Sequence, residues 1–182
     1  ASWIRQLGTA TADKATGIAV DNAGNAYITG RTAANIFSQD LEGLFDSSQA
    51  QSKNLDYDRV GDVFVAKYDA EGKRVWQEQL GTKGFEEATG IVVDNAGNLY
   101  VAGSTDGIQG NGTRDALSNH DVWLVKYDSS GKRQWTRSLG QQANASKNQL
   151  GYDVSKGGMG IDPNGNIYLT GYTFSNLDGS NA

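Results

Sequence analysis

Acidic side chains stand where several predicted strands begin, and they are the residues of this sequence best placed to do chemistry. They are Asp13, Asp62, Asp121 and Asp153. A ring of such carboxylates could bind a cation such as calcium, which takes about six to eight oxygen ligands. The same carboxylates could instead cap backbone amides or pair with Arg31, Arg59 and Arg114. The sequence leaves both alternatives open, with calcium placed at Asp13, Asp62 and Asp121.

Other candidate binding residues belong to the variable connections between strands. They are Tyr57, Asp58, His120 and Tyr152. His120 is the single histidine, so a histidine metal cluster or a Ser-His-Asp triad within the chain would depend on it alone. Its polar neighbours Asn119 and Asp121 indicate a solvated loop histidine instead. Together with the four strand-start aspartates, these residues form the predicted ligand-binding set.

Pairs of carboxylates raise the question of catalysis. Glycoside hydrolysis needs two Asp or Glu side chains. Asp56 with Asp58, or Glu86 with Glu87, could supply such a pair. Acidic residues in loops are more often solvated than catalytic, so no catalytic residue is predicted. A carbohydrate-active hydrolase remains the alternative to a binding module.

Composition and charge argue against several classes of protein. The net charge of −5 and the pI of about 4.8 disfavour a nucleic-acid binder, which usually carries a basic patch. Cysteine is absent, so disulfides and thiolate sites are excluded. No apolar run approaches the length of a membrane span, and membrane insertion is not expected. Calcium is the one cofactor that the sequence suggests.

Two repeated patterns organise the chain and must position these residues. Residues 21–32, 94–105 and 162–173 share the pattern Asp-x-x-Gly-Asn-x-Tyr-x-x-Gly-x-Thr. A second pattern, Asp-x-x-x-x-Lys-Tyr-Asp-x-x-Gly-x-x-x-Trp, begins at Asp62 and again at Asp121. The repeats predict units of four strands. In the first unit these are residues 15–20, 25–32, 62–68 and 73–81.

Short turns are predicted between neighbouring strands of a unit. The segments from Asp21 to Gly24 and from Asp69 to Gly72 have Asp first and Gly fourth. In such hairpin turns the Asp side chain caps backbone amides and Gly takes a left-handed conformation. Each turn offers one carboxylate, whereas an EF-hand loop places ligands at alternate positions over about twelve residues. Turn capping is therefore predicted for these aspartates rather than calcium binding.

The faces of the predicted strands indicate the architecture. Residues 62–68 are largely apolar on both faces, and residues 15–20 are apolar or small on both. Residues 73–81 alternate more between apolar and polar. An antiparallel sheet with one solvated face would alternate throughout, so the inner strands are expected to lie between neighbouring sheets. This predicts an all-β fold of β-propeller blades, each with four antiparallel strands.

The connections differ in how much their lengths vary. The first turn of each unit keeps one length, and so does the second. From Thr32 to Asp62 the chain takes thirty steps, whereas from Thr105 to Asp121 it takes sixteen. In an up-and-down blade all of this variation falls at one end. Insertions of this kind commonly mark the binding face of a repeat protein.

The two patterns resemble the SBBP β-propeller repeats of bacterial proteins, which are often secreted or attached to the surface. The resemblance covers nearly the whole chain apart from the long connections. It implies a propeller and a secreted or cell-surface location. It carries no established catalytic residues. A signal for export would lie outside this chain.

One propeller region is predicted over residues 1–182, with about two and a half blades. Residues 3–9 are expected to be the outer strand of a preceding blade, followed by blades at 13–82 and 86–140 and an incomplete blade at 153–182. Propellers usually have about four to eight blades. Further blades are therefore expected, from a longer polypeptide or from other copies.

Three functions remain open from the sequence. The first is a non-enzymatic binding or scaffold module that recognises a protein or glycan through its long loops. The second is the hydrolase, and the third is a purely structural repeat of a surface assembly.

Overall fold

The computed structural model describes residues 3–9, 12–33, 61–81, 85–105, 121–139 and 153–173 of the chain. Within these ranges the chain forms ten strands, and no helix is long and apolar enough to cross a membrane. The strands are β1 (Asp13–Val20), β2 (Ala26–Thr32), β3 (Asp62–Tyr68), β4 (Arg74–Leu80), β5 (Glu86–Val93), β6 (Leu99–Thr105), β7 (Asp121–Tyr127), β8 (Arg133–Leu139), β9 (Asp153–Ile161) and β10 (Ile167–Thr173).

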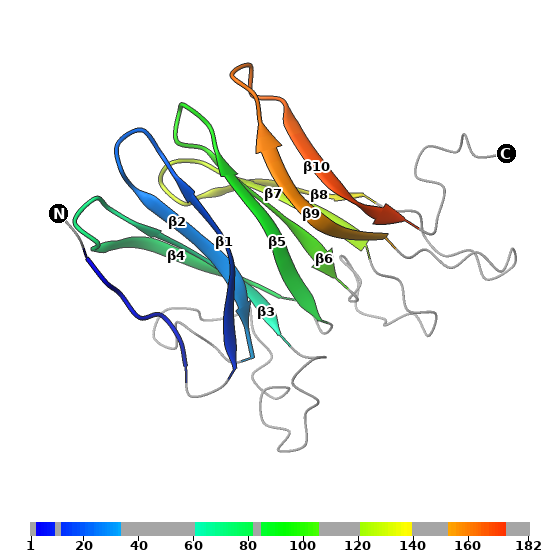
Figure 1. Ribbon diagram of the computed structural model, residues 1–182, viewed down its shortest axis with the longest axis horizontal. Helices are drawn as coiled ribbons and strands as arrows, with labels where there is room; N and C mark the ends of the chain where they lie inside the picture. Colours follow the sequence, from blue (N-terminus) through cyan, green and yellow to red (C-terminus); the bar gives the residue numbers. More distant parts are fainter. Residues whose placement is uncertain are drawn as a thin grey trace, which may run out of the picture.

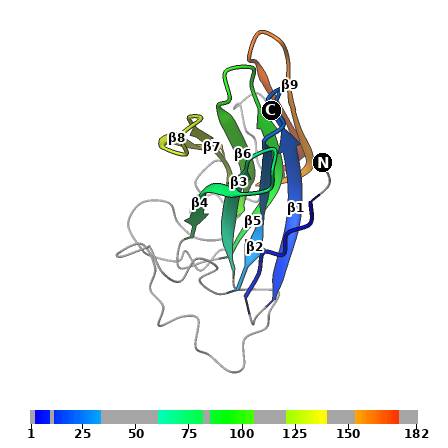
Figure 2. The same ribbon diagram turned by 90° about the vertical axis from the view of Figure 1, so that its left-hand side faces the viewer.

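The strands form three antiparallel sheets that lie side by side (Figure 1). Blade 1 has the order β1-β2-β3-β4, and blade 2 has the order β5-β6-β7-β8. The half blade contains β9 and β10. The first strands β1 and β9 lie on the opposite side of the molecule from the outer strands β4 and β8 (Figure 2). The predicted all-β architecture of four-stranded antiparallel blades is confirmed.

The pairing register gives each blade two distinct ends. In blade 1, Asp13 lies opposite Thr32, and Thr32 lies opposite Asp62. The long connections leave from this end, which we call the loop end. At the other end, the turn end, Ala26 lies opposite both Val20 and Tyr68. Short turns close the turn end, as the repeat predicted.

Neighbouring blades pack through a side chain seated on a glycine. A Cβ on Gly17 of β1 would lie 2.8 Å from Cγ2 of Ile91 in β5. A Cβ on Gly90 of β5 would lie 2.5 Å from Cγ of Met159 in β9. Any larger residue would push the blades apart, because these distances are far below ordinary van der Waals contact. The small residues of the first strands therefore set the spacing between blades.

The core lies between blades 1 and 2. It includes Tyr27, Val65, Leu99, Val101 and Val125, all fully buried. β3 is buried along almost its whole length, whereas β4 is exposed at its start and half-buried further on. This confirms the predicted gradient from inner to outer strands. β1 departs from it, because its residues are exposed or half-buried and no blade precedes it in the described chain.

Tryptophans of the outer strands pack on the next blade. Trp76 of β4 lies against Tyr127, with ring centroids 5.8 Å apart, and against the turn glycine Gly131. Trp3 lies in the same way against Tyr68 and Gly72. Residues 3–9 thus occupy the place of an outer strand of a preceding blade, although they form no strand themselves. Trp3 and Trp76 therefore serve the packing between blades.

Lys67 of β3 is buried although it is charged. Only 8% of the residue is exposed. Its ammonium group lies 5.1 Å from the centre of the Tyr27 ring and donates to the carbonyl of Ser129 in blade 2 at 3.3 Å. A buried lysine needs such partners, because desolvating an unpaired charge is costly. In blade 2, Lys126 lies over Tyr100 at the same distance of 5.1 Å.

Candidate functional site

Carboxylate residues line the loop end of the blades, where the register places them at equivalent positions. We call Asp13, Asp62, Glu86, Asp121 and Asp153 the acidic rim. In blade 1 two of them flank Thr32, and in blade 2 the corresponding pair flanks Thr105. In the half blade, Asp153 lies opposite Thr173. The sequence-based set contained four of these five residues.

Glu86 is the rim residue that the binding-site prediction missed. It begins β5 as Asp13 begins β1, and it precedes Ala88 by two positions as Asp13 precedes Ala15. This spacing was the signal that could have identified it. Only 2% of Glu86 is exposed, and its Oε1 accepts a hydrogen bond of 2.8 Å from the hydroxyl of Thr105.

Asp62 lies in an environment that disfavours the charged form of its carboxyl. Burial raises the pKa of its carboxyl, the hydrogen bond from Gln79 lowers it, and the charge of Glu86 raises it, with a result of about 7. Gln79 donates to Oδ2 of Asp62 at 3.0 Å. Glu86 belongs to blade 2, and its backbone amide donates to the carbonyl of Gly61 at 2.9 Å. Two acidic residues of neighbouring blades are thus brought close together beside a backbone contact.

Asp13 holds the chain that leads into β1. Its Oδ2 accepts hydrogen bonds from the backbone amide and the hydroxyl of Thr9, the latter at 3.0 Å. Its Oδ1 is buried without a hydrogen-bond partner. Asp13, Asp62 and Glu86 therefore each accept hydrogen bonds from the protein itself, and the one from the backbone amide of Thr9 to Asp13 is in keeping with the capping alternative.

The calcium alternative stays a prediction. Among the described residues no group of three or more His, Cys, Asp or Glu side chains is arranged to hold a metal ion. Of the three proposed ligands, Asp13 and Asp62 have described side chains, and Asp121 is placed through its backbone only. Tyr57, Asp58, His120 and Tyr152 lie outside the described residues, and Asp153 is also placed through its backbone alone.

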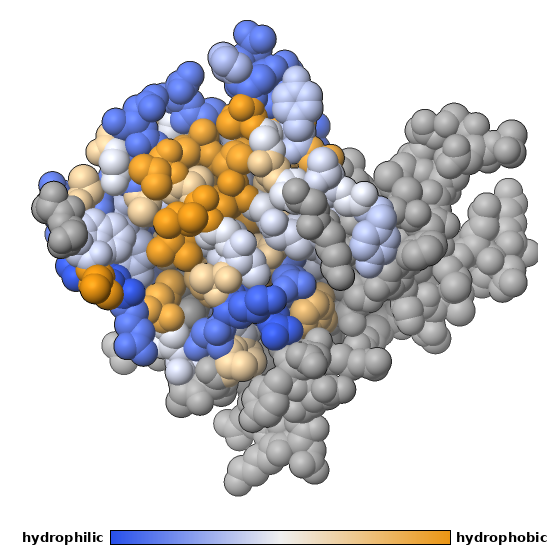
Figure 3. Space-filling model, viewed as in Figure 1, coloured by the Kyte–Doolittle hydropathy of each residue, from blue (hydrophilic) through white to orange (hydrophobic). Residues whose placement is uncertain are grey.

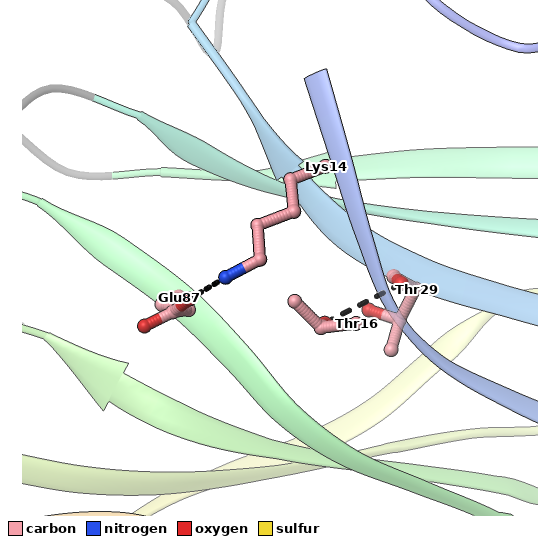
Figure 4. Close-up of polar contacts among 4 residues, drawn as sticks. All are labelled: Lys14, Thr16, Thr29 and Glu87. Carbon is pink, nitrogen blue, oxygen red and sulfur yellow. Dashed lines mark hydrogen bonds and ion pairs between the residues drawn. The ribbon is translucent and has the colours of Figure 1, made fainter. Parts of the chain in front are cut away.

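The two carboxylates of β5 that could form a hydrolase pair have different partners. Successive residues of a strand point to opposite faces, so Glu86 and Glu87 are separated. Glu86 accepts from Thr105, whereas Glu87 forms an ion pair of 3.6 Å with Lys14 of blade 1 (Figure 4). The other proposed pair, Asp56 and Asp58, lies outside the described part of the chain.

The aspartates of the turn end have a different environment. Oδ1 of Asp94 accepts from the backbone amides of Ala96 and Asn98 at 2.9 and 2.8 Å. Its Oδ2 accepts from the side-chain amide of Asn98 at 2.7 Å and from the hydroxyl of Tyr100 at 3.3 Å. The turns at Asp21 and Asp162 repeat this arrangement. The predicted turn capping is confirmed.

These hydrogen bonds determine the charge state of the turn aspartates. Burial raises the pKa of Asp94, but the hydrogen bonds from Asn98, Ala96 and Tyr100 outweigh it, so the pKa lies below the ordinary value. The pKa of Asp21 is lowered by the equivalent balance. The sequence pattern contained the Asn and the Tyr, but their hydrogen bonds to the Asp became evident only from the structure.

Two comparisons relate the chain to known proteins. It is 25% identical, over 207 aligned residues and 99% of its length, to an uncharacterized WD repeat-containing protein, L264, of Acanthamoeba polyphaga mimivirus. The chain spans 14% of that relative's length. The SBBP family, described as a β-propeller repeat, matches residues 2–38, 78–108 and 134–178, which together make up more than half of the chain. This protein therefore belongs to the SBBP β-propeller repeat family.

Proposed function

We propose that this chain is a non-enzymatic β-propeller module that binds a protein or glycan through the loop end of its blades. The observation that carries the proposal is the contrast in connections. The turn end is closed by near-identical turns whose aspartates are bonded within the turn, whereas every connection of variable length leaves from the loop end. Length variation confined to one end is typical of the binding face in repeat proteins.

The net charge of the chain suggests what kind of partner fits. It is −5, so a partner with basic groups would be attracted, and the attraction would weaken with added salt. We therefore favour a protein with a basic surface over a neutral glycan. The likeness to a WD repeat-containing protein and the match to a β-propeller repeat support a scaffold that binds proteins. A secreted or cell-surface location in a bacterium is part of the proposal and rests on the sequence resemblance alone.

An exchange of connections within the chain tests this function. Residues 34–60 join β2 to β3, and residues 106–120 join β6 to β7 at the equivalent position. The variant carries a second copy of 106–120 in place of 34–60. As a control, residues 70–71 of one turn are exchanged with residues 129–130 of the corresponding turn. Both variants should keep the circular dichroism spectrum and the melting temperature of the wild type.

Binding is measured in two steps. Proteins retained by the immobilised chain are identified and purified, and their affinity is measured by calorimetry at low and high salt. A glycan array is probed in parallel. The connection exchange should weaken binding by about tenfold or more, which corresponds to about 1.4 kcal/mol, while the turn exchange should have no effect. Binding that survives the connection exchange but is lost on the turn exchange would contradict the proposal.

A further inference from the structure

Two junctions of the molecule are built on the same tryptophan contact. A Cβ on Gly72 would lie 2.5 Å from Cδ2 of Trp3, and a Cβ on Gly131 would lie 2.6 Å from Cδ2 of Trp76. The two tryptophans also lie against equivalent tyrosines, at ring-centroid distances of 5.9 and 5.8 Å. Residues 3–9 therefore meet blade 1 as β4 meets blade 2, and the residues that follow each tryptophan can be compared.

The residue two positions after the tryptophan differs between the two junctions. At the first junction it is Arg5, whose Nε donates to the carbonyl of Gly72 at 2.8 Å. At the junction of blades 1 and 2 it is Glu78, which lies on the same face of β4 as the tryptophan because side chains two positions apart in a strand share a face. The equivalent carbonyl there belongs to Gly131. An ionised carboxylate can only accept hydrogen bonds, whereas a protonated carboxyl can donate one to a carbonyl.

Glu78 brings its carboxyl into the outer part of a largely apolar junction. Apolar residues gather over the side of the molecule where β1 and β5 lie (Figure 3), and Val65, directly opposite Glu78 in the sheet, is fully buried in the core. Glu78 itself is half-buried. Burial raises the pKa of its carboxyl and the charge of Arg133 in β8 lowers it, with a net shift above the ordinary value. Folding therefore favours the protonated form.

The other titratable or charged groups of the described residues at this junction come from β3, β7 and the turn before β8. Lys67 donates to a carbonyl of that turn at 3.3 Å. Asp128 accepts two backbone amides of the turn at 3.0 Å each, and its pKa is lowered by these bonds and by the charge of Lys132. The hydroxyl of Tyr127 is buried and has no hydrogen-bond partner among the described residues, and burial and the charge of Glu78 raise its pKa. Of the two acids, only Glu78 is thus disfavoured in its charged form.

We propose that Glu78 makes the contact between blades 1 and 2 dependent on pH. In its protonated form it donates to the carbonyl of Gly131, as Arg5 donates to the carbonyl of Gly72, and it gives up this contact when the proton passes to solvent. The ionised carboxylate turns instead to the side chain of Arg133. This inference goes beyond the proposed function and does not depend on it.

The direction of the pH dependence follows from the shift. Because the pKa of Glu78 in the folded state lies above the unfolded value of about 4.3, the stabilisation is fully present below that value. It is lost as the pH rises through the folded pKa. Blades 1 and 2 are therefore held together more strongly in mild acid than at neutral pH.

The titration of Glu78 is the first test. Its carboxyl signal in the NMR spectrum of the ¹³C-labelled chain is identified by its loss in Glu78→Gln, and the midpoint should lie above about 4.3. Tryptophan fluorescence, to which Trp76 at the junction contributes, should change with the same midpoint. Glu78→Gln and Glu78→Arg both keep a donor that cannot ionise in this range, so both should lose this change. Glu71→Gln is the matched control on an exposed residue of the preceding turn and should keep it.

Melting temperatures provide a second test, in an Asp62→Asn background that removes the other carboxyl with a raised pKa. There, Glu78→Gln should leave the melting temperature unchanged at pH 4 and raise it by about 2 to 4 °C at pH 7. The same measurements show whether each variant is folded, and Glu78→Arg replaces Glu78→Gln if the latter does not fold.

Three results would overturn the proposal. They are a midpoint for Glu78 at or below about 4.3, a fluorescence change that persists in the folded Glu78 variants, and a rise in melting temperature at pH 7 that Glu71→Gln produces equally.

Discussion

Carboxylates lie at both ends of the blades, but the pKa shifts of Asp21 and Asp94 at the turn end and of Asp62 at the loop end have opposite directions. At the turn end, hydrogen bonds from the turn itself hold the pKa values of Asp21 and Asp94 below the ordinary value, even against burial. At the loop end, burial and the charge of Glu86 raise the pKa of Asp62 to about 7 despite one hydrogen bond. A charged carboxylate therefore stabilises the folded state where several hydrogen-bond donors surround it. It destabilises the folded state where burial outweighs the few donors it has.

The largest expected effect concerns Asp62. Because its pKa in the folded state exceeds the unfolded value of about 3.9, the folded protein retains a proton that the unfolded chain loses, and the free energy of unfolding falls as the pH rises from about 4 to about 7. The shift corresponds to about 2 to 4 kcal/mol at neutral pH. Asp62→Asn should remove this loss, so the variant should be more stable than the wild type at pH 7.

Urea unfolding at a series of pH values measures the difference between the two proteins. Asp21→Asn is the matched control, because it changes the same residue type at the turn end and should lower the stability. If the stability curves of the wild type and of Asp62→Asn run parallel between pH 4 and 7, the folded state does not disfavour the charged form of Asp62.

The next effect concerns a turn glycine. Gly97 has a φ of 79°, in the left-handed region that a β-branched residue rarely adopts. Gly97→Val should lower the free energy of unfolding by about 3 kcal/mol through backbone strain. Ala96→Val, on the exposed neighbouring residue of the same turn, serves as the control and should change the stability little. Equal melting temperatures for Gly97→Val and the wild type would refute the assigned role of the turn.

The smallest effect concerns the cap of the same turn. Asp94→Ala removes the acceptor of two backbone amides and of the Asn98 and Tyr100 side chains, and should cost about 1 to 2 kcal/mol at neutral pH. Because the folded pKa of Asp94 is lowered, its contribution is present above about pH 4 and is lost as the pH falls through the folded value. The wild type and the variant should therefore converge in acid. A constant difference at all pH values would contradict the charged cap.

Much of the fold could be predicted because repeated residues face repeated surroundings. The predicted strand at 62–68 coincides with β3, and the segment predicted at 15–20 lies within β1. The turns were predictable because Asp and Gly determine the backbone locally. Ile18 and Ile91 show the limit of this reasoning. They are equivalent in the repeat, yet their exposure differs because exposure depends on which blade lies alongside.

The candidate site was less accessible to prediction for a related reason. Asp13 and Asp62 could be found from their place at the start of strands. The raised pKa of Asp62 depends on Glu86 from another blade, which no local pattern indicates. Lys67 likewise contacts a carbonyl of the following blade, so its burial could not be deduced from its own strand.

The seating of Trp76 on the turn of blade 2 has a consequence for anyone dividing or recombining this protein. A fragment cut as β1 to β4 would carry Trp76 without the glycine on which it rests. A fragment from β4 to β7 with the turn at Gly131 would keep the tryptophan and its seat together. The unit that can be transferred between proteins is therefore shifted by one strand relative to the four-stranded sheet. Fragments cut at that position should keep the contact between Trp76 and Gly131.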